Sequence, residues 1–288
     1  MSNTSADPLP SITEDDAIGE IADLYADIRQ TLDMSFVNLV WRVLAAVPGG
    51  LAYSWGSLKP LYTSGLAYAE ARALEAGLKL PSVPQLPTAA LRAVGVDAAA
   101  ETKIRAAIDG YRQGNPLNTV TFSALLVRLR GESAVEAQDL QAEKAPGPSP
   151  YGKAPPLQNF DDMSATSAEL VRAVNLLGAD EIGSRVQVSL PRNLAPWPGF
   201  LALYWALLAP LHESGALRAA VDTVLAEGHE RGRRLEAHLG DVGEAKPETV
   251  RGVREVLENL VPNAMGRMIP VVSLLNRMLP EPNTQLED

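Results

Sequence analysis

The stretch RVLAAVPGGLAYSWGSLKPLYTSG at residues 42–65 returns 150 positions later as RNLAPWPGFLALYWALLAPLHESG at residues 192–215. The two stretches align without a gap, and 13 of their 24 positions are identical. One of the identities pairs Trp55 with Trp205. Chance does not readily match a tryptophan, two prolines and two glycines in one ungapped window. The sequence therefore predicts an internal duplication.

A second, weaker match extends the duplication toward the end of each unit. Residues 104–129 align without gaps onto residues 253–278, now at an offset of 149, and Arg105 then matches Arg254. Several apolar positions also pair within this window. Because two separated windows agree on their spacing, we interpret them as one repeated unit and not as two similar helices.

A change of composition separates the two units. Residues 131–161 hold five prolines, few large apolar residues and no sustained periodicity, which is typical of a linker. We therefore predict a first helical repeat at residues 1–130, a proline-rich linker at 131–161 and a second helical repeat at 162–288. Duplicated units often pack about a pseudo-twofold axis, by the logic of a symmetric dimer, and a pocket at their junction is then lined from both halves.

Helical patterns dominate both units, so we predict an all-α fold. Apolar residues recur at three- and four-residue spacing over residues 18–32. Gly114 is expected to end a helix, and a further helix is expected after Asn115 and Pro116. The only candidate strand is VQVSL at residues 186–190, and it is short.

Composition excludes several classes of protein. The formal net charge is −10, which opposes binding to nucleic acid and to anionic lipid. The chain has no cysteine, which excludes disulfides, thiolate metal sites and a cysteine nucleophile. The three histidines lack metal-ligand spacing, so we expect no metal site. Without a signal-like N-terminus or an apolar run of about 20 residues, a cytoplasmic location is expected.

The Gly-Asn-Pro sequence at residues 114–116 has two interpretations. Asn115 at a helix start could simply be an N-cap, because asparagine is favoured there. A polar amide at a helix start, beside outward-pointing backbone N–H groups, could also belong to a binding site. The residues alone favour the N-cap interpretation.

Three motifs in this order resemble the helical DL-2-haloacid dehalogenase family. They are RVLAxxPGxL at residues 42–51, GNP at 114–116 and LAxWP ending at Pro198. The resemblance implies an all-α homodimer that uses no metal or organic cofactor. It also implies cleavage of the carbon–halogen bond of small 2-halocarboxylic acids, in which an aspartate acts as general base on a water that attacks the 2-carbon.

The resemblance assigns roles to particular residues of this chain. The asparagine that helps to hold the water falls on Asn115, and apolar residues of the substrate pocket fall near Phe36 and Leu39. The family's serine–aspartate pair falls on Ser189 and Leu190, so leucine stands where the general base is expected. We therefore predict a substrate-binding set of Phe36, Leu39, Ser189 and Leu190, with Asn115 positioning water and the general base unknown.

Two functions follow from this pattern. The first is a dehalogenase-like hydrolase of small 2-haloacids, with a base from elsewhere in the chain. Asp33 is a candidate for that base if burial raises its pKa. The second is a non-catalytic small-ligand-binding or interaction protein on the same fold. A further interpretation is a dehalogenase by descent only, in which Leu190 packs the cavity shut. The expected partner in both cases is a short carboxylic acid.

Overall fold

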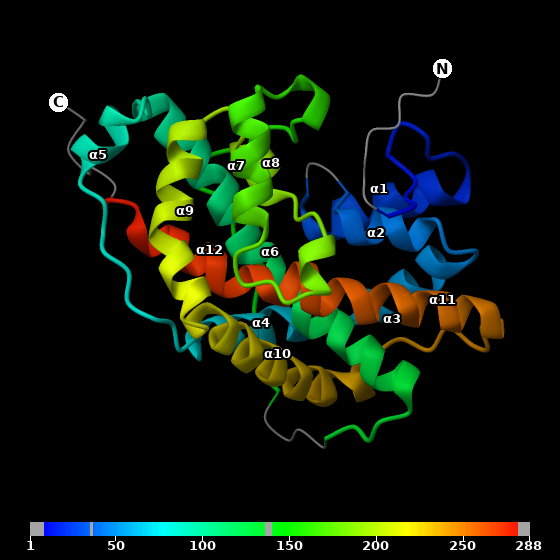
Figure 1. The fold of residues 1–288 in the computed structure, drawn as a ribbon. Coiled ribbons are helices and arrows are strands. Elements are labelled where there is room, and N and C mark those ends of the chain that lie inside the picture. Colours follow the sequence, from blue (N-terminus) through cyan, green and yellow to red (C-terminus); the bar gives the residue numbers. More distant parts are fainter. Residues whose placement is uncertain (1–8, 35–36, 136–139, 282–288) are drawn as a thin grey trace.

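A computed structural model describes residues 9–34, 37–135 and 140–281, so the predicted pocket residue Phe36 lies outside the described part. All regular structure in this part is helical, and it contains no strand (Figure 1). The predicted all-α class is confirmed. None of the described helices combines the length and the apolar character that a membrane span needs.

The candidate strand at residues 186–190 is wrong. Val186 follows a short 3-10 helix, η2 (Gly183–Arg185), and Leu190 begins α8 (Leu190–Leu194). The Asn175 side chain donates to the Val186 carbonyl at 3.1 Å and accepts from the Val188 N–H at 2.9 Å. These backbone groups are therefore satisfied by a side chain, without a neighbouring strand.

Short helices of the first half are followed by one long helix. They are α1 (Glu20–Leu32), α2 (Leu39–Ala45), α3 (Gly50–Thr63), α4 (Leu66–Ala76), α5 (Thr88–Ala93) and α6 (Ala98–Arg130).

The second half runs through a similar order of helices. Beside η2 and α8 it contains η1 (Phe160–Asp162), α7 (Ala165–Asn175), α9 (Pro198–Glu213), α10 (Ala216–Leu235), η3 (Glu236–His238), α11 (Pro247–Leu260), the π-helical η4 (Val261–Gly266) and α12 (Arg267–Met278). Gly65 and Gly215, which match in the sequence repeat, precede α4 and α10 with φ of 84° and 78°. Such backbone angles favour glycine at both positions.

α6 is continuous over 33 residues, so the predicted helix end at Gly114 is wrong. The Asp97 side chain caps its start by accepting from the Ala100 N–H at 2.7 Å. Pro116 removes one backbone hydrogen bond and costs about 3 kcal/mol in a helix interior. Nearly every residue from Asn115 to Val127 is buried, and this burial offsets the loss. Asn115 is consequently not an N-cap.

Two hydrophobic cores cross the boundary between the predicted repeats. Ile104 and Ile108, from the first half of α6, pack in the core built mainly by α7, α8, α9 and α12. Val253 and Leu257, from α11, pack in the core built mainly by α1 to α4. α6 crosses the middle of the molecule beside α12 and α10 (Figure 1). Residues 1–130 and 162–288 therefore do not enclose separate cores.

The segment between the halves lies along the surface of both. Its described residues from 131 to 159 form no helix. The Val135 N–H donates to the Arg233 carbonyl, and the Glu143 N–H donates to the Gly65 carbonyl, both at 3.1 Å. Further along, this segment reaches α8, where the candidate site is found.

Candidate functional site

α8 brings the predicted serine and leucine against the middle of the molecule. Ser189 directly precedes this helix and is partly buried, whereas Leu190 is fully buried. Pro191 stands in the first turn, where its fixed φ suits a helix start. The helix packs on α6, α7 and α9, so both residues face elements of the two halves.

Tyr111 of α6 makes the polar contact between the halves at this point. Its hydroxyl donates to Asn193 Oδ1 at 2.8 Å and also hydrogen-bonds with the Ser189 side chain. Burial raises the pKa of Tyr111 above its ordinary value, although the Ser189 hydrogen bond and the charges of Arg192 and Arg42 act in the opposite direction. The phenol is therefore a hydrogen-bond donor at neutral pH and not a base.

Two arginines make the surroundings of the Tyr111 hydroxyl electropositive. Arg192 is buried, and its Nε donates to the Gln158 carbonyl at 2.9 Å. Arg42 comes from α2, and it matches Arg192 at the offset of 150 in the sequence repeat. Both positive charges act on the Tyr111 hydroxyl. The surroundings of this hydroxyl therefore favour a small anion over a cation or a neutral molecule.

Asn115 lies one helical turn after Tyr111 on α6. Side chains four positions apart lie on the same face of a helix, about 5–6 Å from each other. Asn115 is 8% exposed, and its Nδ2 has no hydrogen-bond partner among the described residues. An unsatisfied buried N–H group costs about 1–3 kcal/mol, which a bound water or ligand acceptor would recover. We call Tyr111, Asn115, Ser189, Leu190 and Asn193 the junction site.

Within the part of the chain that the structure describes, no carboxylate hydrogen-bonds to Tyr111, Ser189 or Asn193. Among the described residues the buried acids are Glu70 and Asp109, and both are paired elsewhere. Glu70 contacts arginines of α10, and Asp109 contacts Arg112.

Asp33 is exposed at the C-cap of α1. The hypothesis that burial turns Asp33 into the base is therefore wrong.

A groove of about 710 Å³ lies outside the junction site. It is bordered by the 180–186 loop, α11 and η4, with Leu9 at one side. Its acids include Asp180 and Glu258, which pair with Arg218 at 3.3 Å and Arg130 at 3.0 Å. These acids are therefore engaged in ion pairs on the outer face.

The remaining predicted residues are distributed unevenly. Leu39 begins α2 and packs on the first core, one turn before Arg42, whereas Leu190 belongs to the second core. Among the described residues no group of three or more histidine, aspartate or glutamate side chains could hold a metal ion. The sequence pattern did not single out Tyr111 or Asn193, because their hydrogen bond spans 82 positions.

The helical fold of this chain matches that of solved structures. The structure superposes on that of a D-2-haloacid dehalogenase mutant with a TM-score of 0.74 and 16% sequence identity, over 94% of this chain and 96% of the other. A mutant of that enzyme in complex with D-2-CPA gives a TM-score of 0.71 over the same shares, and the complex with L-LA gives 0.70. The fold is that of the helical D-2-haloacid dehalogenases.

Proteins similar in sequence are also named as 2-haloacid dehalogenases. A configuration-inverting 2-haloacid dehalogenase from Pseudomonas sp. (strain 113) is 28% identical over 205 residues, which is 67% of this chain and 64% of the relative. Another from Alcaligenes xylosoxydans xylosoxydans is 27% identical over 278 residues, covering 94% and 88%. An (R)-2-haloacid dehalogenase from Pseudomonas putida is 39% identical over 82 residues, covering 26% and 27%. No family model matches the chain. The predicted resemblance to the 2-haloacid dehalogenases is confirmed.

Proposed function

We propose that this chain is a 2-haloacid dehalogenase-like protein whose junction site binds a small 2-halocarboxylic acid. The observation that carries the proposal is the buried Asn115 amide, whose Nδ2 has no partner among the described residues, one turn from a protonated Tyr111 in an electropositive setting. A carboxylate accepts hydrogen bonds from N–H and O–H donors, and the charges of Arg42 and Arg192 favour its negative charge. The relatives named as 2-haloacid dehalogenases supply the substrate class.

Hydrolysis at this site requires a group that Leu190 does not provide. Direct attack of water on the 2-carbon needs a proton acceptor close to that water, and Asn115 is the residue we propose to position it. Leu190 is fully buried and has no proton-accepting atom. Binding without rapid hydrolysis is therefore the function that the site chemistry supports best.

A slow dehalogenase-like hydrolase is the second candidate. The similarity to configuration-inverting 2-haloacid dehalogenases over most of the chain favours it. In that case the base comes from outside the described contacts of the junction site. The two candidates share one ligand class and differ only in whether halide is released.

Isothermal titration calorimetry with D- and L-2-chloropropionate tests binding. The wild type is expected to bind at least one enantiomer, and Asn115→Ala is expected to weaken that affinity about tenfold because it removes a hydrogen bond to an ionised group. Asn259→Ala is the matched control, since that side chain lies on α11 and pairs with Asn263 at 3.2 Å. Absence of heat with either enantiomer at millimolar concentration contradicts the proposal.

We also propose that the two halves are duplicated units about a pseudo-twofold axis and that two chains form a homodimer. The spacing of the helices supports the duplication, because α6 spans residues 98–130 and the α11–α12 helix spans 247–278. Sedimentation equilibrium at several protein concentrations measures the oligomeric state, and a strict monomer contradicts the homodimer.

A further inference from the structure

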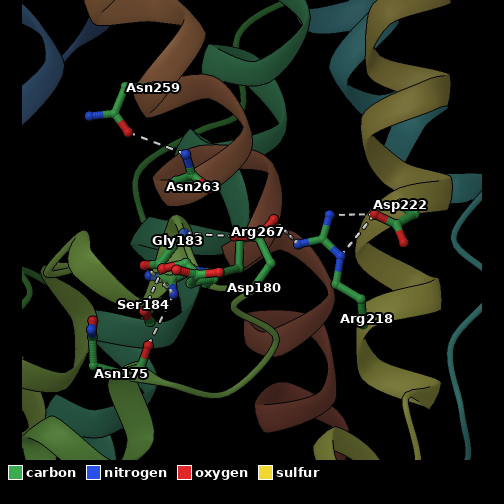
Figure 2. Close-up of polar contacts among 10 residues, drawn as sticks. Asn175, Asp180, Gly183, Ser184, Arg218, Asp222, Asn259, Asn263 and Arg267 are labelled. Atoms are coloured by element: carbon green, nitrogen blue, oxygen red, sulfur yellow. Dashed lines mark hydrogen bonds and ion pairs between the residues drawn. The ribbon is translucent and has the colours of Figure 1, made fainter.

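A buried arginine holds the segment that leads into the junction site. Arg267 is the first residue of α12 and is 1% exposed. Its Nη1 donates to the carbonyl oxygens of Asn175 at 3.0 Å and Gly183 at 3.1 Å (Figure 2). Its Nη2 donates to the Val186 carbonyl at 3.2 Å. One side chain therefore joins α12 to the end of α7 and to two points of residues 183–188.

Asn175 holds the same segment from α7. Its amide nitrogen donates to the Val186 carbonyl, which Arg267 also contacts, and its amide oxygen accepts from the Val188 N–H. Ser189, the junction-site residue that contacts Tyr111, follows Val188 directly. The path of the backbone into Ser189 is thus fixed by two buried side chains.

The packing around Gly183 leaves this segment little freedom to move. A Cβ atom at Gly183 would lie 3.0 Å from Asn263 Oδ1 and 3.2 Å from Asp180 Oδ1. The Gly183 N–H donates to Asp180 Oδ1 at 2.7 Å. Asn263 belongs to the π-helical η4, which ends directly before Arg267. The arginine and the surface against which the segment packs are therefore parts of one continuous element.

Burying the Arg267 guanidinium costs desolvation free energy, and its hydrogen bonds among the described residues go to backbone oxygens. Burial lowers the pKa of Arg267 to about 10, although Tyr204 and Asp180 act in the opposite direction. The guanidinium stays protonated at neutral pH, so its hydrogen bonds are charge-assisted. Apolar residues of similar volume often replace buried charges without loss of stability. What they do not supply is the three-point attachment of a polar backbone segment.

We infer that Arg267 is a positioning residue of the junction site, acting through residues 183–188 to fix the place of Ser189 relative to Tyr111. This inference rests on the proposed function, since Ser189, the residue that Arg267 positions, belongs to the junction site that is proposed to bind the 2-haloacid. The guanidinium itself touches no residue of the junction site in the described contacts. A displacement of about 1 Å at a binding group is enough to weaken recognition strongly.

The test compares two variants that loosen the segment with one that does not. Arg267→Lys keeps the charge but replaces the planar fork by a single ammonium, and Asn175→Ala removes the second attachment. Arg105→Lys is the matched control, because Arg105 is also buried and donates to a backbone carbonyl, that of Pro280, away from residues 183–190. Hydrogen–deuterium exchange of residues 186–190 and calorimetry with 2-chloropropionate are measured well below the melting temperature of each protein.

Arg267→Lys and Asn175→Ala are expected to speed exchange in residues 186–190 and to weaken 2-chloropropionate binding about tenfold. Arg105→Lys is expected to change neither, even where its melting temperature falls as far. If the wild type binds 2-chloropropionate and either Arg267→Lys or Asn175→Ala binds it with unchanged affinity, the positioning role of Arg267 is overturned. The proposed function then still stands. A wild type that binds neither enantiomer overturns the proposed function, and the inference falls with it. If Arg267→Lys does not fold, Asn175→Ala decides.

Discussion

Tyr111 connects the two halves through one hydroxyl group. That hydroxyl donates to Asn193, whose Nδ2 in turn donates to the Pro155 carbonyl of the segment between the halves at 2.6 Å. A phenylalanine would keep the ring but leave Asn193 Oδ1 without its donor. The cost of leaving such an acceptor unsatisfied exceeds that of removing a hydroxyl in a loosely packed place.

Tyr111→Phe is therefore expected to lower the free energy of unfolding by about 1–2 kcal/mol. Tyr53→Phe is the control, because Tyr53 is partly buried in α3 and its hydroxyl makes none of the hydrogen bonds found among the described residues. Urea denaturation followed by circular dichroism measures both. Equal losses in the two variants would show that the Tyr111–Asn193 bond contributes nothing specific.

Part of this site could be predicted from the sequence, and part could not. Motif order placed Asn115 and Ser189 among the candidate residues, and the leucine at 190 was visible as a departure. The contact of Ser189 with Tyr111 could not be predicted, because Tyr111 approaches α8 only where α6 crosses between the two cores. The expected helix end at Gly114 failed for a related reason: a local Gly-Asn-Pro signal was outweighed by burial along α6.

At the scale of elements, α6 and α10 approach each other closely through small residues. A Cβ atom at Gly232 of α10 would lie 2.6 Å from Ser123 Cβ and 2.7 Å from the Ala124 backbone nitrogen. Gly110 of α6 is exposed, and a Cβ atom there meets nothing within 4 Å. Packing between the helices requires glycine at position 232. Gly110 only adds conformational entropy to the unfolded chain.

Gly232→Ala is expected to destabilise the protein by about 1–3 kcal/mol, because the helices must separate. Gly110→Ala is expected to stabilise it by about 0.4–1 kcal/mol. Thermal and urea unfolding of the two variants measure these changes. A neutral Gly232→Ala would mean that the α6–α10 contact adjusts without cost.

One carboxylate of α1 makes polar contacts with α3. Asp27 accepts from Trp55 Nε1 at 2.7 Å and from Lys59 Nζ at 2.7 Å, and the Lys59 and Trp55 hydrogen bonds lower its pKa below the ordinary 3.8. A lowered carboxyl pKa adds stability above the unfolded-state value, and that stability is lost as pH falls through the folded-state value. Solvent screening keeps the effect small, because the Asp27 side chain is 37% exposed.

We expect wild type to be more stable than Asp27→Asn at neutral pH, with the difference shrinking as pH falls below 3.8. Urea titrations at a series of pH values measure the difference. A gap between the two proteins that does not depend on pH would contradict the role of the Asp27 charge.

At the scale of the whole molecule, each of the two hydrophobic cores contains helices from both halves. α11 completes the first core, and the first part of α6 completes the second. The sequence repeat identified the equivalent windows, but a repeat does not reveal which copy of a helix completes which core. This crossing places Tyr111 of the first half against Ser189 of the second half.

Fragments 1–130 and 162–288 are consequently expected to lack cooperative unfolding when produced separately, because each loses part of its core. Mixing them is expected to restore helical circular dichroism and a single melting transition. A cooperative transition in either fragment alone would show that one half is an independent domain.

Halide release from D- and L-2-chloropropionate tests whether the junction site receives a 2-haloacid but lacks a general base. Wild type and Leu190→Asp are compared at neutral pH, with Leu190→Asn as the control for a polar group that is not a base. General-base catalysis contributes about 10²–10⁴-fold, so Leu190→Asp is expected to release halide at least about 100-fold faster than the other two. Rapid halide release by the wild type would contradict the statement that the junction site lacks a general base. A folded Leu190→Asp protein as inactive as Leu190→Asn would contradict the site itself.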